Sequence, residues 1–457
     1  MSPHITRITS DKIRVNTSDT WRKNNLISFQ ISIKKTNTMR LLYSFGIKCY
    51  ALGVRVASLF NPKAKLMLAG WRRTFGRLSV APVGKGKTVW FHASSLGEFE
   101  QARPVLEEFR QRYPEYKVCV TFFSPSGFEV RKNYPNADFV CYLPMDTRAN
   151  AIRFVNLLRP SVAFFAKYDY WFNYLEQLRR REVPTYIFSA IFRPQQYFFK
   201  WYGKWFLEQI RGCFTHMFVQ NEESLRLLQS HGFQQVTIAG DTRFDRVQTI
   251  AQEAKHNEAV ERFLAYHPDD PVLLAGSSWE PDEELLRKYL QHRDGHLTLI
   301  IAPHVIDKSH TGWIKDNLLK EVPCTLYSQM GEDDPQSRVL IIDNMGMLSS
   351  LYRYAGVAYI GGGFGAGIHN ILEAVTFGKP VVFGPKYHKF KEACDIVERK
   401  GGYSFDKYEQ LEAILDRLLD DKEVYRHASQ QCIQYMGSNV GSTEQILAIV
   451  DKDLPKY

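Results

Sequence analysis

The chain has 457 residues, of which 44% are hydrophobic and 24% charged, and its net charge is +10. This length exceeds what one hydrophobic core supports, and the composition excludes global disorder, so two globular domains are expected. Seven cysteines without Cys-x-x-Cys spacing exclude a disulfide framework or a zinc site as the organising feature. The positive charge suits nucleic acid, an anionic membrane or a phosphorylated substrate, and the lack of a zinc-finger or RNP signature argues against nucleic acid.

The N-terminal region divides into a polar part and an apolar part. Residues 1–38 are rich in Ser, Thr, Asn and Lys without periodicity, which predicts a disordered leader, and Met39 is an alternative start. No apolar segment is followed by a small-residue cleavage site, so no signal peptide is expected.

Residues 41–60 are mostly apolar, but Lys48 and Arg55 interrupt them and further basic residues follow. This pattern favours a helix lying in or against a membrane surface over a clean span. Residues 39–78 are therefore expected to form a membrane-associating segment. The alternative is a buried N-terminal helix of the first domain.

Short apolar runs then alternate with helical patterns along the rest of the chain. Strands are expected at 88–92, 117–123, 139–143, 161–166, 185–189 and 216–220, and again at 272–275, 298–302, 339–342, 357–360 and 380–383. Such alternation predicts parallel sheets with helices on both faces. The charged stretch 245–270 separates the two series, giving an expected acceptor domain at 79–250 and a donor domain at 268–457. Two Rossmann-like, doubly wound domains facing across a cleft would be the GT-B architecture.

The first candidate site follows the strand at 88–92. Ser94, Ser95 and Gly97 form a small-residue turn on the expected acceptor side, and Glu98 begins a helix. Transfer to a sugar hydroxyl with inversion needs one base for the hydroxyl proton, and Glu98 stands where a cleft would lie. The alternative is that Glu98 only stabilises the positive end of the helix.

The second candidate site follows the strand at 357–360, where Gly362, Gly363, Gly365 and Gly367 form a glycine-rich loop. Backbone amides in such a loop, with a helix start behind them, are suited to holding a phosphate. Glu373, three residues after Asn370, would share a helical face with it and could accept bonds from ribose hydroxyls. Tight packing alone is the alternative use of the glycines.

Seven short motifs, in order, resemble the 3-deoxy-D-manno-octulosonic acid (Kdo) transferases of lipid A biosynthesis. They are His92–Glu98, Gly240–Asp245, Ala275–Glu280, Ile301–His304, Met345–Met347, Gly361–Glu373 and Gly378–Pro385. The resemblance implies a GT-B glycosyltransferase that moves Kdo from CMP-Kdo to a lipid A precursor such as lipid IVA, with inversion and without a metal or cofactor. It also implies work at the cytoplasmic face of the bacterial inner membrane.

The same resemblance assigns residues. The general base falls on Glu98, and two transition-state stabilisers fall near Lys167 and on Arg243. The contacts to CMP fall on Pro303, His304, Met345, Gly346, Met347, Asn370, Ile371, Leu372 and Glu373.

Three positions depart from the family pattern. His304 replaces the usual arginine, Lys167 replaces the first acid of an acid-x-acid-x-Trp segment, and Met347 replaces a common glutamate. These departures leave two alternatives open. One is another GT-B enzyme, such as a UDP-sugar transferase or a nucleotide-sugar epimerase, and the other is a catalytically inactive, membrane-attached binding protein.

Overall fold

The computed structural model describes residues 38–454 except 294–295, 321 and 332–336. Apart from Thr38, the predicted leader lies outside these residues. The described residues divide into two compact units, unit 1 formed by 38–239 with 446–454 and unit 2 by those within 240–445. The division precedes the expected one because Phe244 and Val247 of α9 (Arg243–Glu253) are buried in the core of unit 2.

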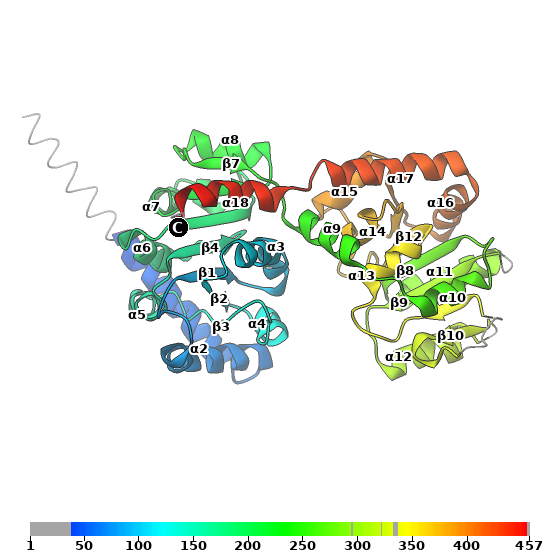
Figure 1. Cartoon of the computed structure of the whole chain (residues 1–457), viewed down its shortest axis with the longest axis horizontal. Helices are drawn as coiled ribbons and strands as arrows, with labels where there is room; N and C mark the ends of the chain where they lie inside the picture. The colour runs from blue at the N-terminus through cyan, green and yellow to red at the C-terminus, as the bar shows by residue number, and fades with distance from the viewer. Residues whose placement is uncertain (1–37, 294–295, 321, 332–336, 455–457) are drawn as a thin grey trace, which may run out of the picture. The chain divides into compact units, whose positions relative to one another are not determined.

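Unit 1 contains a parallel sheet of seven strands in the order β3-β2-β1-β4-β5-β6-β7 (Figure 1). The strands are β1 (Thr88–Ala93), β2 (Lys117–Phe122), β3 (Phe139–Tyr142), β4 (Val162–Ala166), β5 (Thr185–Ala190), β6 (His216–Val219) and β7 (Val236–Ile238). Apart from Lys117, His216 and part of β7, every strand residue is buried. This explains the continuous apolar runs in the sequence, since helices cover both faces of a parallel sheet.

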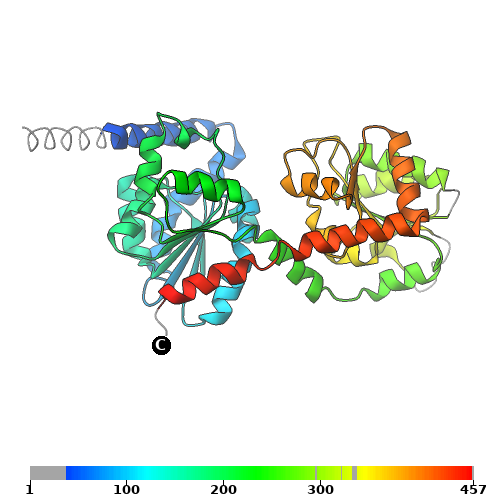
Figure 2. The ribbon, with the colours of Figure 1, turned by 90° about the horizontal axis from the view of Figure 1, so that it is seen from above.

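The helices of unit 1 that follow α2 connect successive strands in the manner of βαβ units. They are α2 (Pro62–Val80), α3 (Leu96–Arg112), α4 (Pro125–Arg131), α5 (Arg148–Leu158), α6 (Phe172–Arg180), η1 (Tyr197–Phe199), α7 (Lys204–Ile210) and α8 (Glu222–Ser230). The last helix of the chain, α18 (Ser442–Asp453), returns to unit 1, where Ile446, Leu447 and Val450 are fully buried beside strand residues (Figure 2).

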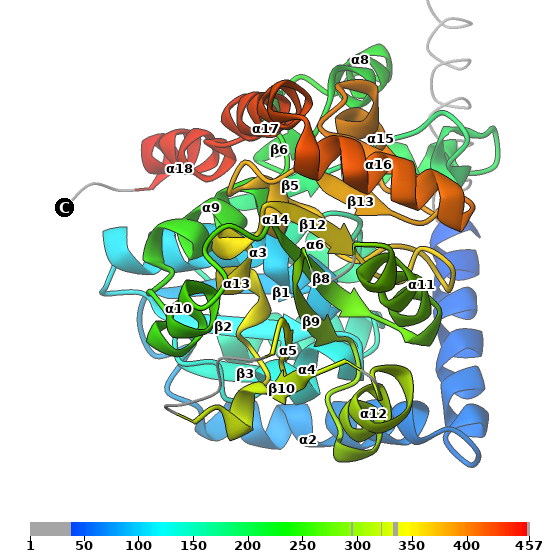
Figure 3. The ribbon, with the colours of Figure 1, turned by 90° about the vertical axis from the view of Figure 1, so that its right-hand side faces the viewer.

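Unit 2 repeats this plan with the strand order β10-β11-β9-β8-β12-β13-β14 (Figure 3). The strands are β8 (Val272–Ser278), β9 (Thr298–Pro303), β10 (Cys324–Leu326), β11 (Val339–Ile341), β12 (Val357–Ile360), β13 (Val381–Phe383) and β14 (Gly402–Ser404). The helices, besides α9, are α10 (Glu258–Ala265), α11 (Glu280–His292), α12 (Lys308–Trp313), η2 (Ile314–Leu318), η3 (Tyr327–Gln329), α13 (Leu348–Leu351), η4 (Tyr352–Tyr354), α14 (Leu372–Val375), α15 (Lys391–Glu398), α16 (Tyr408–Asp420) and α17 (Lys422–Gly437).

Each sheet has a strand pair at which the order of winding reverses. In unit 1 this pair is β1 and β4, and in unit 2 it is β8 and β12, both parallel. Doubly wound sheets bind ligands beyond the carboxyl ends of such a pair. The two sequence-predicted sites, the turn after β1 and the glycine-rich loop after β12, lie at these two positions.

The predicted membrane-associating segment is two helices of different character. In the first, at 38–57, Leu41 is 71% and Phe45 67% exposed, so most of its apolar surface is not buried in unit 1. The second is α2, whose Thr74 and Leu78 are buried and whose Thr74 hydroxyl donates to the Tyr142 carbonyl oxygen at 2.9 Å. The buried-helix alternative therefore fits α2 and not the helix at 38–57. Among the described residues, we find no helix that combines the length and the apolar character needed to cross a bilayer.

Candidate functional site

The first candidate site is the turn between β1 and α3. Ser94 and Ser95 leave the sheet, and α3 places Glu98 in its first turn. The Ser95 hydroxyl donates a 2.9 Å hydrogen bond to Oε2 of Glu98. Glu98 is half-buried and Gly97 exposed, so the carboxylate is held by its neighbour at the carboxyl edge of the sheet. The position also suits the helix dipole, so both interpretations of Glu98 fit the local geometry.

A second carboxyl group lies directly against this turn. Asp169, just after β4, is buried and accepts hydrogen bonds from the Ser94 backbone N–H at 3.0 Å and from the Ser94 hydroxyl. Burial, and next the negative charge of Glu98, raise the pKa of Asp169 well above its ordinary value. Two neighbouring carboxyl groups resist ionising together, so the site disfavours negative charge on the buried one.

His92, at the end of β1, completes the buried part of the site. Its Nε2 accepts a 2.9 Å hydrogen bond from Trp171 Nε1, a group that can only donate, so the imidazole proton sits on Nδ1 and faces Thr121. Burial lowers the pKa of His92 to about 3. The imidazole is therefore neutral, and the 3.6 Å separation between its Nε2 and Asp169 is not an ion pair at neutral pH.

The two predicted stabilising cations belong to different units. Lys167 follows β4 with a left-handed backbone (φ 62°), and its ammonium lies 5.3 Å from the centre of the Tyr168 ring. Arg243, at the start of α9 in unit 2, forms ion pairs with Asp241 at 2.8 Å and Glu392 at 3.0 Å. Burial opposes the charge of Arg243, but these two carboxylates outweigh it and raise the pKa.

The second candidate site is a cavity of about 540 Å³ in unit 2, within the size range of small-molecule sites. It lies beyond the carboxyl ends of β8 and β12. Its lining residues are Trp279, Pro281, Asp282, His304, Gly362, Phe364, Gly365, Ala366, Gly367 and His369. The cavity thus brings together three of the four predicted loop glycines, the predicted His304, and His369.

Three aromatic rings form one wall of the cavity. His304 stacks on Trp279 with ring centres 4.6 Å apart and on His369 at 4.4 Å, with interplanar angles of 27° and 25°. The Trp279 Nε1 donates to His369 Nε2 at 3.2 Å. Burial, and then the neighbouring His304, lower the pKa of His369. A flat aromatic wall of this kind offers a surface on which a planar base can stack.

Asp282, in the first turn of α11, fixes the glycine-rich loop. Its Oδ2 accepts from the Gly362 N–H at 2.9 Å and the Trp279 N–H at 3.0 Å, and its Oδ1 accepts from the Tyr359 hydroxyl at 2.8 Å. Burial raises the pKa of Asp282 despite these three donors. The loop amide of Gly362 is therefore already committed to a side chain.

The packing interpretation of the glycines also holds at particular positions. A Cβ on Gly363 would lie 2.6 Å from the Gly384 backbone, and Gly362 has φ +90°. Both positions therefore need glycine for the backbone alone. The helix expected directly after the loop, which was to support a phosphate, is the four-residue α14, and it begins only at Leu372.

The remaining predicted donor contacts meet around Glu373. Its Oε1 accepts from Asn370 Nδ2 at 3.0 Å, and its Oε2 accepts from the hydroxyl of Ser349 at 2.6 Å. Ser349 belongs to α13, directly after the Met345–Met347 segment, so this bond joins two segments that the sequence places far apart. Met345 is exposed, whereas Ile371 and Leu372 are buried and serve the core. Pro303 ends β9 and leads into His304.

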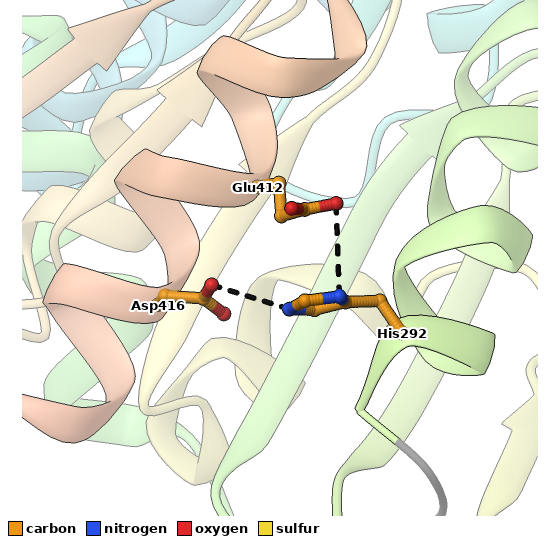
Figure 4. Close-up of side chains that lie close together, drawn as sticks. All are labelled: His292, Glu412 and Asp416. Atoms are coloured by element: carbon orange, nitrogen blue, oxygen red, sulfur yellow. Dashed lines mark hydrogen bonds and ion pairs between the residues drawn. The ribbon is translucent and has the colours of Figure 1, made fainter.

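Among the described residues, one group has metal-ligand chemistry, and it lies on the contact of α11 with α16 rather than at either site. His292 approaches Asp416 at 3.3 Å and Glu412 at 3.8 Å (Figure 4). Arg293 and the Tyr289 hydroxyl bind the same Asp416, at 3.5 and 2.8 Å. With these partners, the group serves to join α11 to α16.

Two functional candidates were missed by sequence reasoning at residue level. Asp169 stood inside the acid-x-acid-x-Trp segment, and Trp279 inside the Ala275–Glu280 motif, yet neither was assigned a role. The motifs themselves were the available signal. Their contacts with Ser94 and His304 span segments far apart in sequence, so only the fold shows them.

Comparison with known proteins identifies the proteins to which this chain is similar. The family model described as 3-deoxy-D-manno-octulosonic-acid transferase matches residues 69–246. The 3-deoxy-D-manno-octulosonic acid transferase of Chlamydia muridarum is 27% identical, over 82% of this chain and 89% of the relative. The transferase of the same name from Haemophilus influenzae is 24% identical, over 87% of this chain and 93% of the relative.

Solved structures with the same fold include UDP-GlcNAc 2-epimerase from Neisseria meningitidis bound to UDP-GlcNAc, with TM-score 0.56, 15% identity, and coverage of 80% of this chain and 100% of that one. A putative UDP-N-acetylglucosamine 2-epimerase from Listeria monocytogenes gives TM-score 0.54 and 14% identity, over 80% of this chain and 96% of that one. These likenesses bear on the fold alone, and with the two seven-stranded sheets they identify a two-domain α/β GT-B architecture. The family model and the relatives, for their part, show that the chain is a glycosyltransferase similar to the 3-deoxy-D-manno-octulosonic acid transferases.

Proposed function

We propose that the protein transfers Kdo from CMP-Kdo to a lipid A precursor, such as lipid IVA, at the cytoplasmic face of the bacterial inner membrane. The observation that carries the proposal is the turn after β1, where Ser95 holds the Glu98 carboxylate beside the buried carboxyl group of Asp169. Similarity to the named relatives, which are Kdo transferases, supports this choice of sugar.

In this mechanism Glu98 is the general base. A sugar hydroxyl is a weak nucleophile until its proton is removed, so the carboxylate takes that proton as the oxygen attacks the anomeric carbon. The bond from the anomeric carbon to the CMP phosphate breaks with its electron pair, and CMP leaves. A single base on the side of attack corresponds to inversion. Inversion and independence of metal remain predictions from the family resemblance.

The donor is assigned to the cavity of unit 2. Its aromatic wall of Trp279, His304 and His369 suits a planar pyrimidine, and Glu373 offers a carboxylate near Asn370. Lys167 and Arg243 remain proposed as stabilising cations. Asp241 and Glu392 accept hydrogen bonds from all three guanidinium nitrogens of Arg243, so these carboxylates hold the guanidinium in place.

A membrane contact is assigned to an apolar and basic surface of unit 1. It consists of the helix at 38–57 and the segment at 197–205, which runs from η1 into the start of α7, and we call it the N-terminal surface. Tyr43 of the helix stacks on Phe206, 6.0 Å between ring centres, and Phe206 contacts Tyr197 of the loop. Trp201 is 90% exposed between the exposed Lys200 and Lys204. Exposed aromatic and basic side chains together are typical of contacts with anionic lipid surfaces.

The proposed function is tested by measuring the transfer of Kdo to the lipid directly. The purified protein, in vesicles that contain a lipid A precursor, is incubated with CMP-Kdo, and the lipid is examined by mass spectrometry. A mass gain of Kdo is expected, and Glu98→Gln should abolish most of it. Thermal stabilisation by CMP and by UDP is measured in parallel, because a ligand that binds only the folded state raises the melting temperature.

Each alternative predicts a different outcome of this test. Stabilisation by UDP and not by CMP would favour another GT-B enzyme and contradict the proposal. Stabilisation by CMP without any lipid product would favour the inactive, membrane-attached binding protein.

A further inference from the structure

We propose that Lys386 and Lys389 supply the positive charge that balances the donor's phosphate in the unit 2 cavity. This inference rests on the proposed function, since it takes the ligand to be a nucleoside monophosphate derivative. It names two residues that neither the motifs nor the family resemblance point to. Both lie in the segment between β13 and α15.

The residues that line the cavity do not themselves balance the negative charge of a phosphate. No lysine or arginine is among the described residues that line it, and Asp282 adds a carboxyl group. His304 and His369 stack on each other in the lining, and burial and His304 lower the pKa of His369. Two stacked imidazoles resist carrying charge together, so they balance a phosphate poorly at neutral pH.

The backbone amides of the glycine-rich loop are also poorly placed to bind the phosphate, because several already donate hydrogen bonds within the protein. The Gly362 N–H donates to Asp282, and the N–H groups of Gly365 and Gly367 both donate to the Gly362 carbonyl oxygen. Three amides of the loop are therefore committed within the protein. The helix that follows has four residues, so its dipole adds little.

The two lysines are bonded to the same loop. The Lys386 ammonium donates to the carbonyl oxygens of Phe364 at 2.9 Å and Gly365 at 3.0 Å, and the Lys389 ammonium donates to that of Ala366. All three acceptor residues line the cavity. The two ammonium groups are thus hydrogen-bonded to the cavity wall itself.

Neither ammonium forms an ion pair with a carboxylate of the described residues, and this separates them from their neighbour Lys391. The Lys391 ammonium is bound to Asp395, 2.5 Å from Oδ2 and one helical turn along α15. An ammonium group has three donors, and the carbonyl contacts use two on Lys386 and one on Lys389. Each lysine therefore keeps a donor and an uncompensated positive charge for an anion at the loop.

The experiment measures binding of CMP and of cytidine to Lys386→Met, Lys389→Met and the double variant by isothermal titration calorimetry. Each single change should weaken CMP binding about tenfold, the ordinary worth of a charge-assisted hydrogen bond. Cytidine, which lacks the phosphate, should bind each variant as it binds the unmodified protein. Rising salt should weaken CMP binding less in the double variant, because less charge remains to be screened.

Lys391→Met is the matched control and should bind CMP normally, and Lys389→Arg should retain most of the affinity. Melting temperatures check that each variant is folded. Equal losses for CMP and cytidine would mean that the lysines only hold the loop, and this would overturn the inference. Unchanged CMP binding by the double variant would also overturn it and leave the proposed function standing. Failure of the unmodified protein to bind CMP would instead overturn the proposed function, and the inference with it.

Discussion

The two candidate sites follow the equivalent strand pair in two similar sheets, but the kinds of residue that form them differ. At the β1–β4 pair of unit 1, the groups are acidic and mutually bonded, with Glu98 and Asp169 linked through Ser94 and Ser95. At the β8–β12 pair of unit 2, aromatic rings and glycine backbone line the cavity, and the Lys386 ammonium is hydrogen-bonded to the glycine-rich loop. This contrast fits the proposed roles, proton transfer at the first site and recognition of a nucleotide at the second.

Because of this difference, we expect one substitution at the first site to reduce turnover abruptly. A single substitution at the second site should reduce ligand affinity only in part. If Glu98 is the base proposed above, its removal takes away the group that accepts the proton, so the effect on turnover should be abrupt. Recognition of a nucleotide is divided among stacking, backbone and charge, so each contact contributes part of the affinity. The predictions below test that contrast.

The largest effect is expected for Glu98→Gln. The amide keeps the size of the side chain but cannot accept the proton, so turnover should fall by roughly a hundredfold or more. CMP affinity should not change, because the proposed donor cavity belongs to unit 2. Turnover and CMP binding are measured on the same preparation.

Glu100→Gln is the control for this variant. Glu100 is two positions further along α3 and pairs with Arg131 at 2.7 Å. An active Glu98→Gln protein beside an inactive Glu100→Gln protein would show that the base is misassigned. Loss of folding in Glu98→Gln would favour the helix-dipole interpretation.

The next effect concerns the N-terminal surface. Leu41, Leu42 and Phe45 are exposed, so replacing all three with glutamine should spare the core and weaken binding to anionic vesicles several-fold. Deleting the whole segment to residue 78 is unsuitable, because α2 is part of the core. Recovery with floated vesicles at low and high salt is the measurement.

Ile433→Gln, an exposed apolar position of unit 2, is the matched control and should leave flotation unchanged. If the triple variant floats as well as the unmodified protein, the membrane contact lies elsewhere.

A smaller effect is expected for His304→Arg. A guanidinium can stack where the imidazole stacks on Trp279, and it stays charged at every physiological pH. CMP should therefore bind at least as well as it binds the unmodified protein, because the added positive charge favours the phosphate. The dissociation constant of CMP is measured for both proteins by isothermal titration calorimetry. A large loss of affinity would show that the local geometry differs from that of the family.

The smallest effect is a pH-dependent stability difference for Asp169→Asn. The pKa of Asp169 is raised in the folded protein, so the folded state binds more protons than the unfolded state above about pH 4. Stability contributed by Asp169 is therefore greatest at low pH and falls as the pH rises. Asparagine cannot ionise, so the melting temperature of the variant relative to the unmodified protein should rise by a few degrees from pH 4 to pH 8.

The contrary trend, a variant that loses relative stability as the pH rises, would mean that Asp169 is ionised and stabilised by Ser94. Asp138→Asn is the comparison. Burial raises the pKa of this carboxyl, but the Val118 N–H and Lys117 outweigh it and lower the pKa. The Asp138→Asn variant should therefore lose relative stability as the pH rises through the acid range below about pH 5, the opposite slope.

Most of the strands could be predicted from the sequence because they are buried on both faces. The run Val357–Ile360 was placed at its observed bounds, and the other predicted strands differ by one to three residues at an end. The missed strands β7, β10 and β14 have three residues each and lie at the edges of their sheets. An edge strand has one neighbour and little burial, so its sequence carries no long apolar run.

The candidate sites were predictable only where the chemistry is local. Glu98 and the loop glycines follow a strand directly, and that position alone indicates the carboxyl edge of a sheet. Asp169, by contrast, becomes meaningful through Ser94, 75 positions away, and Lys386 through carbonyl oxygens more than 20 positions away. Such contacts depend on the strand order, which the periodicity of a single sequence does not specify.

The return of α18 to unit 1 has a consequence for how the protein is made. Ile446, Leu447 and Val450 are fully buried in the core that contains β1, and the Tyr186 hydroxyl of β5 donates to Asp453 at 2.7 Å. A ribosome synthesises all of unit 2 between the sheet of unit 1 and this helix. Unit 1 can therefore be completed only after unit 2 has been synthesised, and the apolar residues that α18 covers stay uncovered until then. Nascent chains should depend on chaperones until α18 has been made.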